Sequence, residues 1–310
     1  IERIEHEIGI PGLAALLAER LTPTDLQSLL LDVYRQRAQR LTPADVLSSY
    51  ESNRFVKPST VAPQRLLEWE QAAFAALPPE FRAVTLAPVC PLGTNSAVAA
   101  VDQNWSLVTI RNSEVISDSS NVLALECARE RRALLRKNPK SKDVVQRAAS
   151  HRLLRTQNYD PDNPRMVPHF SVFTLCSAGQ YQGALRFELA ALRQHIGFYV
   201  RALQTFLGLP LRVALTDFGT EDHRALLTEQ LVAPLQDEFP GVDCAFDDDR
   251  ETGRGYYDHV CFHVYAAEAP GEWLELADGG VVNWTQRLLN NAKERCVISG
   301  IGSERVCMMG

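Results

Sequence analysis

The stretch HRLLRTQNYDPDNPRMVPHFSVFTLC, residues 151–176, decides the fold. Its two ends, residues 151–157 and 169–176, alternate in the way that β-strands do. The segment between them, residues 158–168, holds three prolines and two aspartates and therefore has the composition of a loop. The sequence predicts a hairpin of two strands joined by a long loop.

The hairpin carries two arginines and an aromatic residue in positions that suit a nucleotide. Arg152 and Arg155 lie on the first strand and Phe170 lies on the second. An arginine on a sheet face can hold a phosphate through two parallel hydrogen bonds, and an aromatic ring can stack on a base. The pattern also fits an ordinary hairpin, because charged residues on strands commonly face water.

Outward from the hairpin, strand-like runs alternate with long helical stripes. Strands are expected at residues 106–111, 114–117, 211–215, 256–266, 273–276 and 297–301, with a turn at 278–280. Helices are expected at residues 65–77, 122–135, 185–207, 224–235 and 284–293. Regular strand–helix–strand units, a dinucleotide fingerprint and a phosphate-loop lysine motif are all missing. The sequence predicts an α+β fold with a mostly antiparallel sheet flanked by helices.

Residues 1–60 read as a separate N-terminal helical region, and residues 61–310 as the core. RLTPTDL at 20–26 and RLTPADV at 40–46 share one pattern. In each, the threonine can cap a helix, the proline suits the first helical position, and the aspartate completes a capping box.

A second phosphate-binding candidate is the run ISGIGSER, residues 298–305. Gly300 and Gly302 let the backbone turn from a strand into a helix, Ser303 can cap that helix, and Arg305 lies in its first turn. The pattern also fits a plain glycine turn, since such turns are common.

A polar strand face is expected at RGYYDHVCFHVY, residues 254–265. Alternation predicts that Val260, Phe262 and Val264 pack against helices. The opposite face, expected as a pocket floor, holds Tyr257, His259, Cys261, His263 and Tyr265. A zinc site on this face is the less favoured interpretation, because a fourth ligand and a second shell are not evident, and no metal-ligating residue is assigned.

The polar cluster SDSSN, residues 117–121, precedes a helix. It fits a helix cap. It also allows Asp118 or Ser120 to contact an ammonium group or a ribose.

The net charge and the cysteine spacing indicate which partners and which compartment to expect. The net charge is −6, which gives no general attraction for nucleic acid or anionic membranes. We therefore expect no DNA or membrane partner, and tRNA stays an open question. Seven irregularly spaced cysteines without a CxxC pair favour a reducing, cytoplasmic setting.

Together these segments resemble the catalytic core of class II aminoacyl-tRNA synthetases over roughly residues 65–310. The hairpin at 152–173 looks like the second signature motif, and residues 299–305 look like the third. Arg254-Gly255-Tyr256-Tyr257 resembles a segment of histidyl-tRNA synthetases that reaches the amino-acid pocket.

The resemblance implies roles for these residues. ATP with magnesium would be held by Arg152, Arg155, Phe170, Gly300, Gly302 and Arg305. Arg155 would bind the α-phosphate and Arg305 the γ-phosphate, while Phe170 would stack under adenine. Arg254 would lie near the reacting carboxylate. The pocket for a small carboxylic acid or amino acid would include Asp118, Ser120, Tyr256, Tyr257 and His259. The resemblance also implies a homodimer.

The chain departs from the family pattern at several positions. Gln157 stands where a glutamate is usual, and Phe170-Ser171-Val172 stands where many members have Phe-His-Gln. The Arg-Gly-Tyr-Tyr segment is shortened, so Arg250 is an alternative to Arg254. Five residues follow the third motif, so no anticodon-binding domain is expected. These departures leave three hypotheses open: activation of an acid for a non-standard acceptor, a non-catalytic amino-acid-sensing paralogue, and an unrelated α+β protein.

Overall fold

The core is built on one eight-stranded sheet. The computed structural model describes residues 1–158, 166–219 and 223–309. The strand order is β1-β4-β5-β10-β9-β8-β6-β7. In that order the strands are Arg82–Ala83, Val145–Leu154, His169–Gln180, Glu294–Gly302, Glu272–Val282, Val260–Ala269, Leu211–Asp217 and Asp243–Phe246. Only the two edge pairs, β1 with β4 and β6 with β7, are parallel. The expected mostly antiparallel α+β fold is therefore confirmed.

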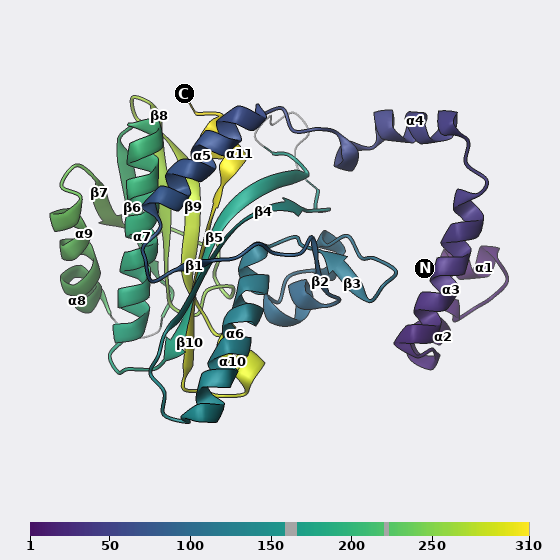
Figure 1. The fold of residues 1–310 in the computed structure, drawn as a ribbon, viewed down its shortest axis with the longest axis horizontal. Helices are drawn as coiled ribbons and strands as arrows, with labels where there is room; N and C mark the ends of the chain where they lie inside the picture. The colour runs from purple at the N-terminus through teal and green to yellow at the C-terminus, as the bar shows by residue number, and fades with distance from the viewer. Residues whose placement is uncertain (159–165, 220–222, 310) are drawn as a thin grey trace.

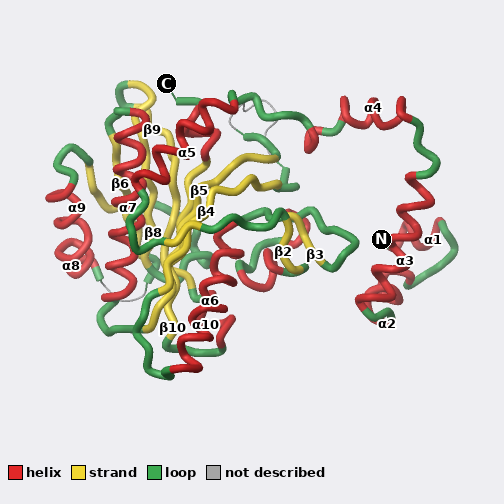
Figure 2. The backbone as a smooth tube through the Cα atoms, in the orientation of Figure 1, coloured by secondary structure: helices red, strands yellow, loops and turns green. Residues whose placement is uncertain are grey.

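Helices cover both faces of this sheet (Figures 1 and 2). One face packs against α5 (Pro63–Ala76), α7 (Arg186–Leu207) and the segment α8 (Arg224–Leu227), η4 (Thr228–Val232) and α9 (Ala233–Glu238). The other face packs against α6 (Ser119–Lys137) and α10 (Trp284–Leu289). A short helix, α11 (Ser303–Cys307), follows β10 directly. A small second sheet pairs β2 (Val89–Pro91) with β3 (Ser113–Val115).

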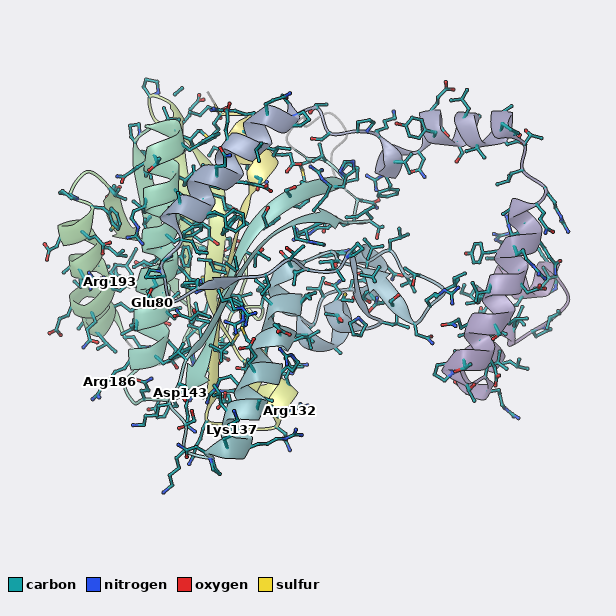
Figure 3. The ribbon with its side chains drawn as sticks, in the orientation of Figure 1. Glu80, Arg132, Lys137, Asp143, Arg186 and Arg193 are labelled. Atoms are coloured by element: carbon teal, nitrogen blue, oxygen red, sulfur yellow. The ribbon has the colours of Figure 1, made fainter. Side chains whose placement is uncertain are left out.

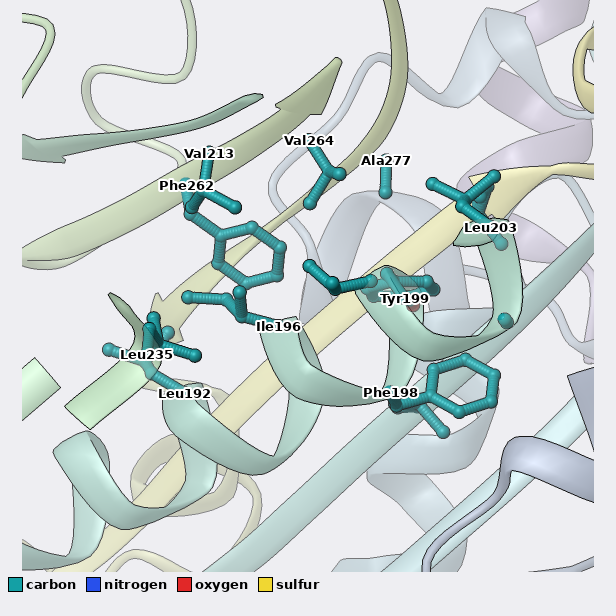
Figure 4. Close-up of a cluster of buried hydrophobic side chains, with 14 of the residues drawn as sticks. Leu192, Ile196, Phe198, Tyr199, Leu203, Val213, Leu235, Phe262, Val264 and Ala277 are labelled. Atoms are coloured by element: carbon teal, nitrogen blue, oxygen red, sulfur yellow. The ribbon is translucent and has the colours of Figure 1, made fainter. Parts of the chain in front are cut away.

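The largest core lies between α7 and the sheet. The apolar stripe of α7 is buried, as its spacing predicts, and it meets Phe262 and Val264 of β8 (Figure 4). Gly208 ends the helix with a φ of 63°, a conformation that glycine adopts without strain. The predicted helix and the predicted apolar face of β8 are both confirmed.

Two predictions for the interior strands β9 and β8 are wrong. Residues 278–280 form no turn, because β9 continues through them. A Cβ on Gly279 would lie 2.4 Å from the Cβ of Ser299, so glycine is there to allow close strand packing. The strand expected from residue 256 begins only at Val260, because Gly253 and Gly255 turn the chain with φ values of 89° and 83°. Tyr256 and Tyr257 therefore lie before the strand.

The N-terminal helices stand apart from the core (Figure 1). They are α1 (Glu2–Glu7), α2 (Leu13–Arg20), α3 (Pro23–Ala38) and α4 (Pro43–Ser52), followed by η1 (Arg54–Val56). The predicted caps are present: Thr22 accepts a hydrogen bond from the amide of Asp25, and Thr42 forms a full capping box with Asp45. None of α1–α4 contains a buried residue.

A candidate active-site cavity

A cavity of about 750 Å³ opens over β5, β10 and β9 beside the start of α6. This volume is in the range of small-molecule sites. Its lining comes from stretches far apart in sequence: η3 (Gln103–Trp105) and its flanks, the cap of α6, the hairpin, the Gly253–Tyr257 turn, β9, and β10 with α11. The lining residues expected from the sequence are Asp118, Ser120, Arg155, Phe170, Tyr256, Tyr257, Gly300, Gly302 and Arg305.

Arg155 and Phe170 form one wall of the cavity. The Nε of Arg155 donates to the carbonyl of Ser117 at 2.8 Å, which fixes the guanidinium beside the start of α6. The guanidinium carbon lies 5.3 Å from the centre of the Phe170 ring. In the described part of the chain no carboxylate pairs with Arg155. Its charge is therefore available to an anionic ligand.

Arg305 approaches the same cavity from α11. One of its Nη atoms donates to the backbone carbonyl of Glu275 at 3.0 Å. Gly300 keeps the floor open: a Cβ there would lie 3.0 Å from Val172 Cγ1. Ser303, expected as a cap, makes no cap hydrogen bond and instead accepts one from the indole of Trp69 at 3.1 Å. The two guanidinium groups thus reach one space from different elements.

Asp118 marks one polar end of the cavity. It is the N-cap of α6 and accepts hydrogen bonds from the amide and hydroxyl of Ser120, at 2.8 and 2.7 Å. The hydroxyl of Tyr256 donates a longer bond, 3.4 Å, to its other oxygen. Burial raises the pKa of Tyr256 well above its usual value, so this phenol stays a donor at neutral pH.

Asp278 also lines the cavity, and two side chains donate hydrogen bonds to it. The hydroxyl of Tyr257 donates to one oxygen at 2.9 Å, and Arg250 donates to the other at 3.0 Å. The side chain of Arg250 is only 4% exposed, whereas that of Asp278 is 40% exposed toward the cavity that it lines. Burial raises the pKa of the Asp278 carboxyl, while the neighbouring Arg250 lowers it. The pair forms a neutral unit at one edge of the cavity.

Arg152, His259 and Arg254 were chosen as site residues but do not line this cavity. Cys261, His263 and Tyr265, expected on a pocket floor, do not line it either. Arg152 donates to Glu304 at 2.8 Å and to Nδ1 of His169 at 2.9 Å, so its charge is already compensated. His259 lies near Asp258, its neighbour in sequence. Arg254 stacks 4.8 Å from the Phe218 ring and lines a separate cavity of about 290 Å³. The alternative position, Arg250, is the arginine that contacts Tyr257 and Asp278.

Sequence reasoning missed four acidic residues that line the cavity: Asp102, Glu275, Asp278 and Glu304. Asp278 was interpreted as part of a turn, although an acidic residue inside a run that continues as a strand is itself a signal. Glu304, also in the lining, is 2% exposed and accepts from the amide of Ser171 at 2.6 Å. It serves to hold the hairpin against α11.

Within the described ranges, no three His, Cys, Asp or Glu side chains gather where they could hold a metal ion. In the same part of the chain, no helix has the length and apolar character needed to cross a membrane. All seven cysteines are free and buried.

Comparison with known proteins identifies the fold. No protein-family profile matches the chain, and no curated protein matches its sequence. Solved structures do match. An apo histidyl-tRNA synthetase from S. aureus is 13% identical over 80% of this chain and 67% of its own, with a TM-score of 0.58.

Two further structures have the same architecture. An ATP phosphoribosyltransferase regulatory subunit/histidyl-tRNA synthetase from Bacillus halodurans is 12% identical over 83% of both chains, with a TM-score of 0.59. A structure from Cryptosporidium parvum, described as the RNA binding domain of threonyl-tRNA synthetase, is 11% identical over 79% of this chain and 62% of its own, with a TM-score of 0.56. The chain has the fold of a class II aminoacyl-tRNA synthetase-like core.

Proposed function

We propose that this protein binds ATP with magnesium and activates a small carboxylic acid, an amino acid, as an acyl-adenylate for a non-standard acceptor. The observation that supports this most strongly is the cavity shared by Arg155, Phe170 and Arg305. Two guanidinium groups that form no ion pair with the described carboxylates, together with an aromatic ring in one cavity, suit a nucleoside triphosphate.

In the proposed reaction, an oxygen of the carboxylate attacks the α-phosphorus. The bond from that phosphorus to the bridging oxygen breaks, and pyrophosphate leaves with the electron pair. Arg155 and Arg305 offset the charge that develops on the phosphate oxygens. An acceptor nucleophile then attacks the acyl carbon and loses a proton as AMP departs. No covalent bond to the protein is needed.

Magnesium fits the oxygen atoms that the cavity provides. Glu275 lines the cavity and its backbone carbonyl accepts a hydrogen bond from Arg305, and magnesium prefers carboxylate and phosphate oxygens. Glu275 would hold the ion together with the phosphates of ATP, and the ion would neutralise part of their charge.

At the other end, Asp118 suits the ammonium group of an amino acid. The hydrogen bonds from Ser120 and Tyr256 orient its carboxylate without supplying a positive charge. A carboxylate that is left without a cation in a partly closed site favours a cationic ligand group.

A second candidate is a non-catalytic paralogue that senses an amino acid. It is favoured by Gln157 and Val172, which line the cavity where the class II pattern has a glutamate and a glutamine. The two candidates predict different results for ATP. The enzyme needs ATP to bind, whereas the sensor binds its amino acid without it.

We further propose that the chain forms a homodimer in the cytoplasm, with residues 61–310 as the catalytic unit and residues 1–60 as a separate helical region. Support comes from the large apolar side chains that the N-terminal helices and their connections expose: Ile1, Ile4, Ile8, Ile10, Leu16, Leu29, Val33, Tyr34, Leu41, Val46, Leu47 and Tyr50. Helices without buried residues gain little stability from packing, so we expect a partner surface to cover these apolar side chains. Free cysteines agree with a reducing compartment.

Pyrophosphate exchange with a panel of amino acids tests the enzymatic proposal. We expect ATP–pyrophosphate exchange that depends on one or a few acids and on magnesium. Silence across the panel, together with an unchanged melting temperature on adding ATP, would refute it. An amino acid that raises the melting temperature in the absence of any ATP effect would favour the sensor.

A further inference from the structure

The acid-binding end of the cavity contains one ion pair and one neutral imidazole. Asp278 and Arg250 form an ion pair at 3.0 Å, and together they carry no net charge. His263 lies 3.5 Å from Asp278 and from Glu275. Burial lowers the pKa of His263 to about 4, so this imidazole is neutral at pH 7 and leaves the balance unchanged.

Asp118 is different. Its oxygens accept hydrogen bonds from neutral groups only, those of Ser120 and Tyr256. In the described residues no arginine, lysine or histidine nitrogen forms an ion pair with it. Glu275, the other carboxylate beside His263, is the proposed magnesium ligand, so Asp118 is the carboxylate left at this end for a cationic group of the acid.

Both oxygens of Asp278 are also partly committed. One accepts from Arg250 and the other from Tyr257. A carboxylate has about four acceptor positions in all, and the side chain is 40% exposed while lining the cavity. Remaining lone pairs are thus open to a ligand. A ligand that displaces water from them must donate hydrogen bonds in return.

From this arrangement we infer that the preferred acid is an amino acid with one ammonium group and an uncharged side chain that donates a hydrogen bond to Asp278, such as a hydroxyl or an amide. The inference rests on the proposed function and names its substrate class. The ammonium group compensates Asp118. The side-chain donor satisfies Asp278, which acts as a specificity-determining residue.

The same arrangement of charges disfavours amino-acid substrates with charged side chains. A basic side chain brings a second positive charge to a pair that Arg250 has already neutralised. An acidic side chain meets the carboxylate of Asp278. Either ligand leaves a poorly solvated charge without a partner, which is costly in a half-closed site. An apolar side chain of the same shape leaves the free lone pairs of Asp278 unpaired.

The test compares matched amino acids in magnesium-dependent pyrophosphate exchange by the full chain. Threonine and valine have nearly the same shape, and asparagine and aspartate differ in charge. We expect kcat/KM for threonine to exceed that for valine about tenfold or more, and asparagine to exceed aspartate and lysine. Equal rates for threonine and valine, or a charged acid as the best substrate, would overturn the inference while leaving acid activation intact. Silence with every acid would overturn both proposals.

An Asp278→Asn variant tests the residue itself. Its loss leaves Arg250 without a counter-charge, so the preference should move from asparagine toward aspartate by about tenfold. The matched control is Asp102→Asn: Asp102 also lines the cavity, but among the described residues its carboxylate accepts hydrogen bonds only from its near neighbour Asn104. Melting curves of both variants verify folding. An unchanged preference in a folded Asp278→Asn protein would contradict the assignment.

Discussion

At the scale of single residues, His195 of α7 lies fully buried between two hydroxyl groups. Its Nε2 is 2.9 Å from the Oγ of Ser177 and its Nδ1 is 2.7 Å from the Oγ of Ser299. Burial lowers its pKa to about 3. In the unfolded chain the pKa is near 6.5, so acid protonates the unfolded state first. The contribution of His195 to stability is full above pH 6.5 and is lost progressively toward pH 3.

The lowered pKa of His195 predicts that acid destabilises the folded protein. Between pH 7 and pH 5, the free energy of unfolding should fall by about 2 kcal/mol through His195 alone. His263, with a pKa of about 4, adds a loss of the same sign. Urea unfolding at the two pH values measures the fall. A His195→Gln variant, less stable at pH 7, should show a flatter pH dependence. Equal stability of the natural chain at pH 7 and pH 5 would contradict the prediction.

Residue placement also shows where sequence reasoning reaches its limit. Arg155, Phe170 and Arg305, chosen from motif spacing, do line one cavity, because strands and their following turns fix where such residues point. His259 was placed by strand alternation and Arg254 by the family resemblance, and neither residue lines the cavity. Gly253 turns the backbone before β8 begins, and a periodic pattern of side chains does not predict such a turn. Asp278 was not predicted as a site residue because the adjacent Gly279 and Gly280 are as typical of a turn as of closely packed strands.

At the scale of elements, one buried ion pair joins α6 to β10. Arg131 donates two hydrogen bonds to Glu294, both 2.8 Å long, and neither side chain is exposed. Arg131 also donates to the carbonyls of Asp143 and Ser141. Because the Arg131 and Glu294 side chains are shielded from water, removing one partner leaves a charge without compensation.

An Arg131→Met substitution should therefore cost about 3–5 kcal/mol of folding stability. Arg129→Met, two residues away on the same helix, is the matched control, because the Arg129–Glu126 pair is on the surface and its loss should cost about 1 kcal/mol or less. Chemical denaturation compares the two. Similar losses for both variants would mean that the buried pair does not hold α6 to the sheet.

The elements themselves differ in how well sequence predicts them. The helix at residues 185–207 is found as α7, Arg186–Leu207, because a long apolar stripe gives an unambiguous period. The edge strands β1 and β7 were not predicted. β1 is only Arg82–Ala83, and its parallel pairing with β4 depends on tertiary contacts rather than on local pattern. Residues 106–111, expected as a strand, contribute only an isolated bridge at Val108.

At the scale of the whole molecule, charged side chains such as Arg132 and Lys137 cover the far end of the core (Figure 3), whereas the N-terminal helices expose apolar ones. The linker after these helices is tied to the cavity rim: Arg54 donates to the carbonyl of Gln157 at 3.2 Å, and His169 donates to that of Lys57 at 2.6 Å. A partner that covers the helices would thereby also steady the hairpin.

The proposed homodimer is tested by sedimentation equilibrium. The natural chain should have twice the monomer mass of 34.6 kDa. Leu47→Glu, which puts a charge at a 57% exposed apolar position of α4, should weaken association. Ser48→Glu, at an exposed polar position on the same helix, should leave it unchanged. A monomer at every concentration, or equal effects of the two variants, would count against an apolar dimer interface.

The central claim at this scale is that Arg155 and Arg305, which lie far apart in the chain, bind the same ATP molecule. Calorimetric titration with ATP and magnesium tests this claim most directly. The natural chain should bind one ATP, and Arg155→Ala and Arg305→Ala should each weaken binding about ten- to a hundredfold, since each removes a charge-assisted contact worth about 1.5–3 kcal/mol. Arg193→Ala, on the outer face of α7 beside Glu238, should bind ATP normally. If folded Arg155→Ala and Arg305→Ala proteins bind ATP as tightly as the natural chain, the two guanidinium groups do not grip a triphosphate.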